Sequence, residues 1–74
     1  MNRGLLVKQV RFAYNSTQKD FGKMLGVTLD EVSKWERGVR SVPDARVFQL
    51  LYYYEMETGN RELFKNIIWE IEHD

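Results

Sequence analysis

The sequence contains no cysteine, a single proline and a single histidine, and its apolar residues never form a run longer than a few positions. Because there is no cysteine, these residues form no disulfide and offer no thiolate ligands to zinc. Because there is no long apolar run, we expect no transmembrane helix, no signal peptide and no membrane partner. Together these absences lead us to expect a cytoplasmic protein.

Residues that could support catalysis are missing as well. The only histidine is His73, next to the last residue, and there is no Cys/His cluster and no glycine-rich loop of the kind that holds phosphates. The carboxylates closest to one another in sequence stand where helices are expected to begin. We therefore expect no enzymatic activity, no cofactor and no metal.

The sequence does contain enough apolar residues for one small domain, and its charge is unevenly distributed. Its 74 residues, of which 43% are hydrophobic, predict a single domain over residues 1–74. The formal net charge is zero, but residues 1–42 hold eight Lys/Arg against four Asp/Glu, whereas residues 43–74 hold three against seven. The N-terminal part is therefore basic, as a nucleic-acid-binding surface requires. An ordinary solvated surface with uneven charge is the alternative.

Residues 17–38 show the pattern of two short helices joined by a tight turn. Thr17 is placed to cap the first helix, and Gly26 can adopt the positive φ that ends it. The segment from Thr28 to Glu31 has the form of a capping box, which predicts the start of the second helix, and Gly38 ends that helix. Two short capped helices in this arrangement form a helix-turn-helix. The apolar positions fall on one face of each helix: Phe21, Met24 and Leu25 in the first, Val32 and Trp35 in the second.

Three more helices are expected around this motif. Apolar spacing predicts one over residues 4–14, a second over residues 43–57 that begins at Pro43, and a third over residues 61–72 that Asn60 caps. The fold class is therefore all-α, with five helices. The residues expected to face the core are Leu6, Val7, Val10 and Tyr14 in the first helix, Val47, Leu51 and Tyr54 in the fourth, and Leu63, Phe64, Ile67, Ile68 and Ile71 in the fifth.

The chain resembles the Cro/CI family of DNA-binding domains, also called XRE-type. The resemblance rests on Thr-Gln-x-x-Phe-Gly-x-x-Leu-Gly-Val-Thr over residues 17–28 and on Val-Ser-x-Trp-Glu-Arg-Gly over residues 32–38, and it extends over residues 7–51. It implies a lambda-repressor-like fold of five helices. It also implies an ion pair between Arg11 and Glu36 that joins the first helix to the third.

In a helix-turn-helix the second helix lies in the major groove, so its start and outer face would read the bases. Lys34 can donate to guanine O6 or N7, Asp30 can accept from the cytosine N4 amine, and Leu29 can contact a thymine methyl group. The resemblance assigns base contacts to the same three positions. Asp30 and Glu31 also have a structural explanation, because acids in the first turn complement the helix dipole. The predicted base-contacting residues are Thr28, Leu29, Asp30, Ser33 and Lys34.

The N-terminus of the first motif helix and the cations around the motif are expected to contact phosphates. The resemblance makes Gln18 the main candidate, through both its side chain and its backbone. For each lysine or arginine alone, a solvated surface position is the alternative. The predicted phosphate-contacting residues are Thr17, Gln18, Lys19, Arg37, Arg40 and Ser41.

A single domain of this size covers too little DNA to bind a specific site tightly alone, so we expect a homodimer. On the helical wheel Tyr53, Met56 and Trp69 point away from the core, and we expect them at the dimer interface. The alternative is that these large side chains are simply half exposed.

The sequence therefore predicts a sequence-specific transcriptional regulator that binds double-stranded DNA at an inverted-repeat operator. The resemblance implies a homodimeric repressor or autoregulator of the phage or antitoxin type. The alternative is a protein-interaction module, such as an antitoxin that neutralises a toxin, which keeps the fold with weak or no DNA binding. The zero net charge, the acids Asp30 and Glu31, and the aromatic residues expected to be exposed near the C-terminus favour that alternative.

Overall fold

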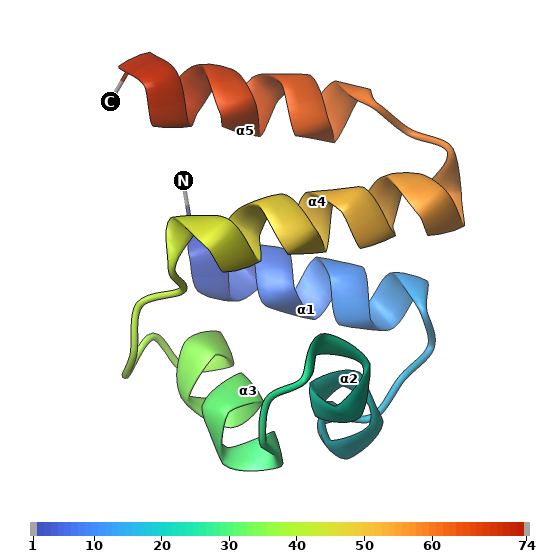
Figure 1. The fold of residues 1–74 in the computed structure, drawn as a ribbon, viewed down its shortest axis with the longest axis vertical. Helices are drawn as coiled ribbons and strands as arrows, with labels where there is room; N and C mark the ends of the chain where they lie inside the picture. Colours follow the sequence, from blue (N-terminus) through green and yellow to red (C-terminus); the bar gives the residue numbers. More distant parts are fainter. Residues whose placement is uncertain (1, 74) are drawn as a thin grey trace.

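The computed structural model describes residues 2–73, and within them the chain forms five helices and no strand. The helices are α1 (Arg3–Ala13), α2 (Gln18–Leu25), α3 (Leu29–Glu36), α4 (Asp44–Thr58) and α5 (Glu62–His73). The predicted all-α fold is confirmed, and the three helices outside the motif are each displaced by one residue from their predicted bounds. In Figure 1, α2 and α3 lie at one end of the molecule, α1 and α4 run across the middle, and α5 covers α4 at the other end.

Local sequence determines where the motif helices begin and end. The Thr17 hydroxyl accepts the backbone N–H of Asp20 at 3.1 Å, and the Thr28 hydroxyl accepts the backbone N–H of Glu31 at 3.1 Å. Between the two helices Gly26 has a φ of 78°, a left-handed conformation that glycine adopts without steric cost. The predicted caps and turn of the helix-turn-helix are confirmed.

One apolar core joins all five helices. Trp35 belongs to it, as predicted, so its ring packs inside the domain and does not face outward from α3. Val42 also belongs to it, although it comes from the loop between α3 and α4 and was not predicted there. Ile71 was also predicted to face the core, but its side chain is not among those that the structure describes. The buried apolar residues are Leu6, Val7, Val10, Phe21, Leu25, Val32, Trp35, Val42, Val47, Leu50, Leu51 and Ile67.

Two glycines allow α3 to lie close to its neighbours. A Cβ at Gly4, in the first turn of α1, would lie 2.5 Å from the carbonyl oxygen of Trp35. A Cβ at Gly22, in α2, would lie 2.8 Å from the carbonyl oxygen of Val27. Because backbone cannot move away as a flexible side chain can, a larger residue at Gly4 forces α1 away from α3, and one at Gly22 forces α2 away from the turn before α3.

The fourth helix is covered on two sides, by α1 and by α5 (Figure 1). Tyr53, which the helical wheel places opposite the core, is half-buried and packs against it. The Tyr14 hydroxyl donates to the Tyr53 carbonyl oxygen at 2.7 Å, and the two rings meet edge to face with centroids 6.0 Å apart. The prediction that Tyr53 points away from the core is wrong, because the helical-wheel argument assumed that α4 buries only one of its faces. Burial, followed by the negative charge of Glu57, raises the pKa of Tyr14 above its ordinary value.

Along residues 2–73, no helix is both long and apolar enough to span a bilayer. The same part of the chain contains no group of three or more metal-ligating side chains placed to hold an ion.

Candidate nucleic-acid interface

An ion pair buried between α1 and α3 fixes the position of the motif. Arg11 Nε donates to Glu36 Oε2 at 2.7 Å, and Arg11 Nη2 donates to Glu36 Oε1 at 2.9 Å. The side chain of Glu36 is 2% exposed and that of Arg11 is 15% exposed, so solvent screens the pair only weakly. Hydrogen bonding to Glu36 raises the pKa of Arg11 above its ordinary value. The predicted pairing of Arg11 with Glu36 is confirmed.

The same carboxylate orients the first residue of α2. Gln18 Nε2 donates to Glu36 Oε1 at 3.2 Å, so one buried carboxylate links α1, α2 and α3. The side-chain amide of Gln18, predicted to reach a phosphate, thus has an internal partner. Its backbone N–H lies in the first turn of α2, where a helix supplies no acceptor of its own. The backbone group is therefore available to an external anion.

The outer face of α3 carries the residues predicted to read bases. Thr28, Leu29 and Asp30 are exposed, and Ser33 and Lys34 are half-buried. Lys34 Nζ lies 3.0 Å from Asp30 Oδ2, one helical turn away. The structure thus brings the five residues together on one helix surface, and their contact with DNA stays a prediction.

The loop after α3 brings further polar groups to this surface. Arg37, Arg40 and Ser41 are exposed. Arg37 Nε donates to Ser33 Oγ at 3.2 Å, and Arg40 Nη1 donates to Glu31 Oε2 at 3.2 Å. Of the predicted capping box, Glu31 makes the half in which its backbone N–H donates to Thr28, while its carboxylate contacts the loop. The second contact was not predicted, because no local pattern fixes how the loop folds back.

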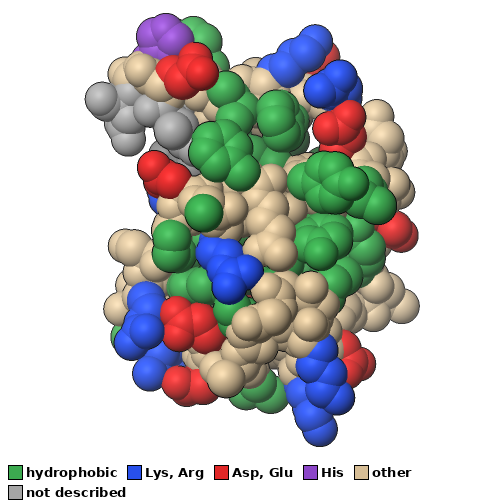
Figure 2. All heavy atoms as spheres, in the orientation of Figure 1, with side chains coloured by type: hydrophobic (Ala, Val, Ile, Leu, Met, Phe, Trp, Pro, Cys, Tyr) green, Lys and Arg blue, Asp and Glu red, His purple; other side chains and the backbone are tan. Residues whose placement is uncertain are grey.

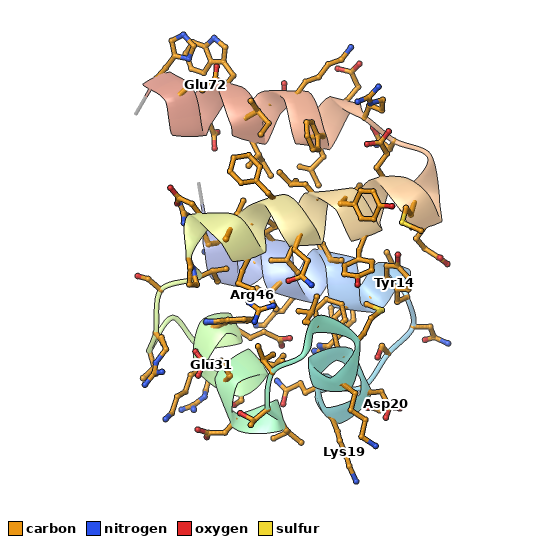
Figure 3. The ribbon with its side chains drawn as sticks, in the orientation of Figure 1. Tyr14, Lys19, Asp20, Glu31, Arg46 and Glu72 are labelled. Carbon is orange, nitrogen blue, oxygen red and sulfur yellow. The ribbon has the colours of Figure 1, made fainter. Side chains whose placement is uncertain are left out.

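The N-terminus of α2 completes the interface. Thr17 and Lys19 are exposed there, and Lys19 projects away from the body of the molecule (Figure 3). Figure 2 shows Lys and Arg side chains at the end of the molecule formed by α2 and α3, with acidic side chains between them. On the face that Figure 2 shows, this end of the molecule therefore offers phosphates several cations that acidic side chains separate.

Two arginines that sequence reasoning missed hold the surrounding segments in place. Arg46 Nη1 donates to the Leu25 carbonyl oxygen at 2.7 Å, which fixes the start of α4 against the end of α2. Arg3 Nη1 donates to the Val42 carbonyl oxygen at 2.6 Å, and Arg3 Nη2 lies 2.7 Å from Asp44 Oδ1. These partners are remote from the arginines in the sequence, so no residue spacing could have indicated them.

Exposed apolar side chains occur on α4 and α5. Met56 and Trp69, both predicted for a dimer interface, are 62% and 61% exposed. The Trp69 ring stacks on His73 with the ring centroids 4.3 Å apart. Phe48 and Tyr52 are exposed too, and their four-residue spacing places them in one stripe of α4 with Met56. Sequence reasoning missed this stripe, although the spacing was there to find it.

Comparison with known protein families agrees with this geometry. Residues 7–51 match the model of a family described as helix-turn-helix. The matched segment begins in α1 and ends in α4, so it contains both motif helices, the turn between them and the Arg11–Glu36 pair. Neither a curated protein nor a solved structure matches the chain significantly.

Proposed function

The chain belongs to the helix-turn-helix family of DNA-binding transcription regulators of the Cro/CI type, and on this premise we propose that it binds a specific duplex DNA sequence as a homodimeric repressor. The main support is the outer face of α3. Its polar side chains are exposed at Asp30 and half-buried at Ser33 and Lys34, whereas Val32, Trp35 and the ion pair of Glu36 fix its inner face. A fixed helix with one uncovered polar face suits the major groove of B-DNA, which admits an α-helix.

In this binding mode α3 lies in the major groove and α2 crosses the phosphate backbone. Lys34 donates to guanine, Asp30 accepts from the cytosine N4 amine and Leu29 contacts a thymine methyl group. Thr28 and Ser33, at the start and on the same face of α3, supply hydroxyls to neighbouring bases or phosphates.

Phosphates are contacted from both motif helices. The first-turn N–H groups of α2 bind one phosphate, because a helix N-terminus attracts anions. Gln18 takes part through its backbone N–H while Glu36 holds its side chain in position. The residues proposed to contact phosphates are Thr17, Gln18 and Lys19 on α2, and Arg37, Arg40 and Ser41 after α3.

A homodimer supplies the second half of the binding site. The proposed contact residues are Phe48, Tyr52 and Met56, which form one stripe of α4 next to the half-buried ring of Tyr53, and Trp69 on α5. Exposed apolar side chains of this size form the kind of patch that marks an interface. Twofold symmetry then places the two copies of α3 in half-sites about 34–36 Å apart, which requires an inverted-repeat operator.

Selection of bound duplexes from a random DNA library tests the proposed function. We expect the enriched duplexes to share an inverted repeat with half-sites centred about 10 base pairs apart, or a multiple of that distance. The Lys34→Glu variant keeps the buried face of α3 and should enrich no shared sequence. If the unmodified protein enriches no sequence above the input library, the proposed function is wrong.

A second candidate function is binding to another protein, such as a toxin that this chain would neutralise. It is favoured by the acidic C-terminal part, where residues 43–74 hold seven Asp/Glu against three Lys/Arg, and by the exposed side chains of Met56 and Trp69. Either function would be carried out in the cytoplasm. A folded protein that enriches no DNA would support this second candidate over the first.

A further inference from the structure

Both acids in the first turn of α3 contact cations of the same surface. Asp30 Oδ2 lies 3.0 Å from Lys34 Nζ, and Glu31 Oε2 lies 3.2 Å from Arg40 Nη1. The Asp30–Lys34 pair lies on the outer face of the helix, where the Asp30 side chain is 69% exposed. The Glu31 side chain is only 24% exposed, and its partner belongs to the loop. The two pairs therefore stand in different positions relative to a bound duplex.

A duplex that approaches this face meets a donor and an acceptor side by side. Lys34 alone could bind any phosphate or base acceptor within reach, but leaving Asp30 would place an unpaired carboxylate close to the phosphates. Binding without that penalty requires a base pair that satisfies both side chains at once. The ammonium group needs a hydrogen-bond acceptor, and the carboxylate needs a donor next to it.

A G·C pair presents this combination in the major groove. Guanine N7 and O6 are adjacent acceptors, and the cytosine N4 amine lies beside them as a donor at the edge of the pattern. In an A·T pair the adenine N6 amine lies between two acceptors, N7 and the thymine O4. A carboxylate that accepts from that amine would therefore have an acceptor on each side. One lysine can bind only one of these two acceptors, so the A·T pair is the poorer match.

We infer that Asp30 and Lys34 read a G·C pair as one unit, with Asp30 as a specificity-determining residue. Lys34 Nζ donates to guanine O6 or N7, and Asp30 accepts from the N4 amine of the paired cytosine. On other sequences Lys34 can bind the DNA only by leaving Asp30 as an unpaired carboxylate close to the phosphates, so Asp30 lowers the affinity for DNA that lacks the G·C pair. This inference rests on the proposed function and names the base pair that α3 selects.

The Glu31–Arg40 pair provides a matched control within the same turn of helix. Arg40 lies in the loop and would contact phosphate, which carries no base information. Removing the charge of Glu31 releases Arg40 to any duplex. Glu31→Gln should therefore strengthen binding to all sequences by a similar factor, whereas a change at Asp30 should alter the preference between sequences.

Affinities measured on two duplexes test the inference. The first duplex is selected by the unmodified protein from a random library, and the second has the conserved G·C pair of each half-site replaced by A·T. We expect the unmodified protein to prefer the first by about 5- to 100-fold per half-site, the usual discrimination by a good base contact. Asp30→Ala should reduce that preference to a few-fold and tighten binding to an unrelated duplex.

Lys34→Ala and the double variant Asp30→Ala with Lys34→Ala complete the set. If the two residues act together, removing Asp30 has no further effect once Lys34 is gone. The double variant should then prefer the G·C duplex as much as Lys34→Ala alone does. Glu31→Gln should leave the ratio of the two affinities unchanged, and melting curves should show that all variants are folded.

Two results would overturn the inference while leaving the proposed function intact. One is a selected operator with no G·C pair at the position sensitive to Lys34→Ala, and the other is an unchanged G·C preference in Asp30→Ala. Failure of the unmodified protein to enrich any sequence would refute the proposed function itself, and the inference with it.

Discussion

Removing one partner of the Arg11–Glu36 pair should cost much more stability than removing both. In Arg11→Met the carboxylate of Glu36, whose side chain is 2% exposed, keeps only the amide of Gln18 as a donor. An uncompensated buried charge costs about 3–5 kcal/mol. At about 0.05–0.15 kcal/mol per residue, the free energy of unfolding of the 74-residue domain is about 4–11 kcal/mol. Arg11→Met should therefore remove a large fraction of the stability.

The opposite single variant should be milder. In Glu36→Leu the guanidinium of Arg11 still donates to the Ser16 carbonyl oxygen, and its side chain is 15% exposed, so the lost hydrogen bonds are partly replaced by water. We expect a loss of about 1–3 kcal/mol. The double variant Arg11→Met with Glu36→Leu buries no charge and should lie within about 1 kcal/mol of the unmodified protein.

Urea unfolding followed by circular dichroism measures these differences, provided that the slopes of the transitions agree among the four proteins. The coupling free energy from the double-mutant cycle should be at least about 3 kcal/mol. Losses that simply add in the double variant, or a larger loss in Glu36→Leu than in Arg11→Met, would refute this description of the buried pair.

The remaining predictions concern the core, the helix contact and one tyrosine. Trp35→Ala should lower the free energy of unfolding by about 3–5 kcal/mol through a core cavity, whereas Lys34→Ala should change it by less than about 0.5 kcal/mol in urea unfolding. Gly4→Ala should cost about 1–3 kcal/mol in the same assay, because its Cβ would meet the carbonyl oxygen of Trp35. Tyr14→Phe removes the hydrogen bond to Tyr53 and should cost about 0.5–1.5 kcal/mol at neutral pH. Folding raises the pKa of Tyr14 above its ordinary value of 10.0, so this contribution is fully present below pH 10.0 and is lost as the pH rises through the folded-state pKa.

Each of these predictions can fail in a specific way. Normal melting of Trp35→Ala together with early melting of Lys34→Ala would mean that the two faces of α3 are exchanged. If Gly4→Ala is as stable as the unmodified protein, α1 and α3 lie further apart than the contact between Gly4 and the Trp35 carbonyl oxygen requires. A stability difference between Tyr14→Phe and the unmodified protein that keeps the same size and sign as the pH rises well above 10.0 would show that Tyr14 does not titrate as described.

The parts of the fold that depend on neighbouring residues were predictable from the sequence. Thr17 and Thr28 cap helices through N–H groups three residues away, and Gly26 turns the chain by its own φ. The position of Leu29, Asp30 and Lys34 on the outer side of α3 was predictable because the buried side of a short helix, here Val32 and Trp35, fixes which side faces outward. Family resemblance added the Arg11–Glu36 pair, which no local spacing could supply.

What could not be predicted depends on contacts between remote segments. Tyr53 was misplaced because its burial depends on the contact with Tyr14 of α1, which the helical wheel of α4 alone does not reveal. The partners of Arg3 and Arg46 are carbonyl oxygens, and every residue offers one, so composition and spacing do not select among them. The contact between Glu31 and Arg40 depends on the path of the loop after α3, which neither side chain encodes alone.

We propose that this surface binds duplex DNA through several phosphates, and the salt dependence of the binding constant reports on those contacts. For the duplex selected from the random library, the logarithm of the association constant should fall linearly with the logarithm of the salt concentration, with a slope of about −0.9 per phosphate contacted. Lys19→Ala and Arg40→Ala should each flatten that slope by about one unit per contact removed, which is about two units for a homodimer with one such contact in each half-site, and should weaken all duplexes alike. A binding constant that does not change with salt would refute DNA binding through this surface. The same would follow if both variants showed the slope of the unmodified protein.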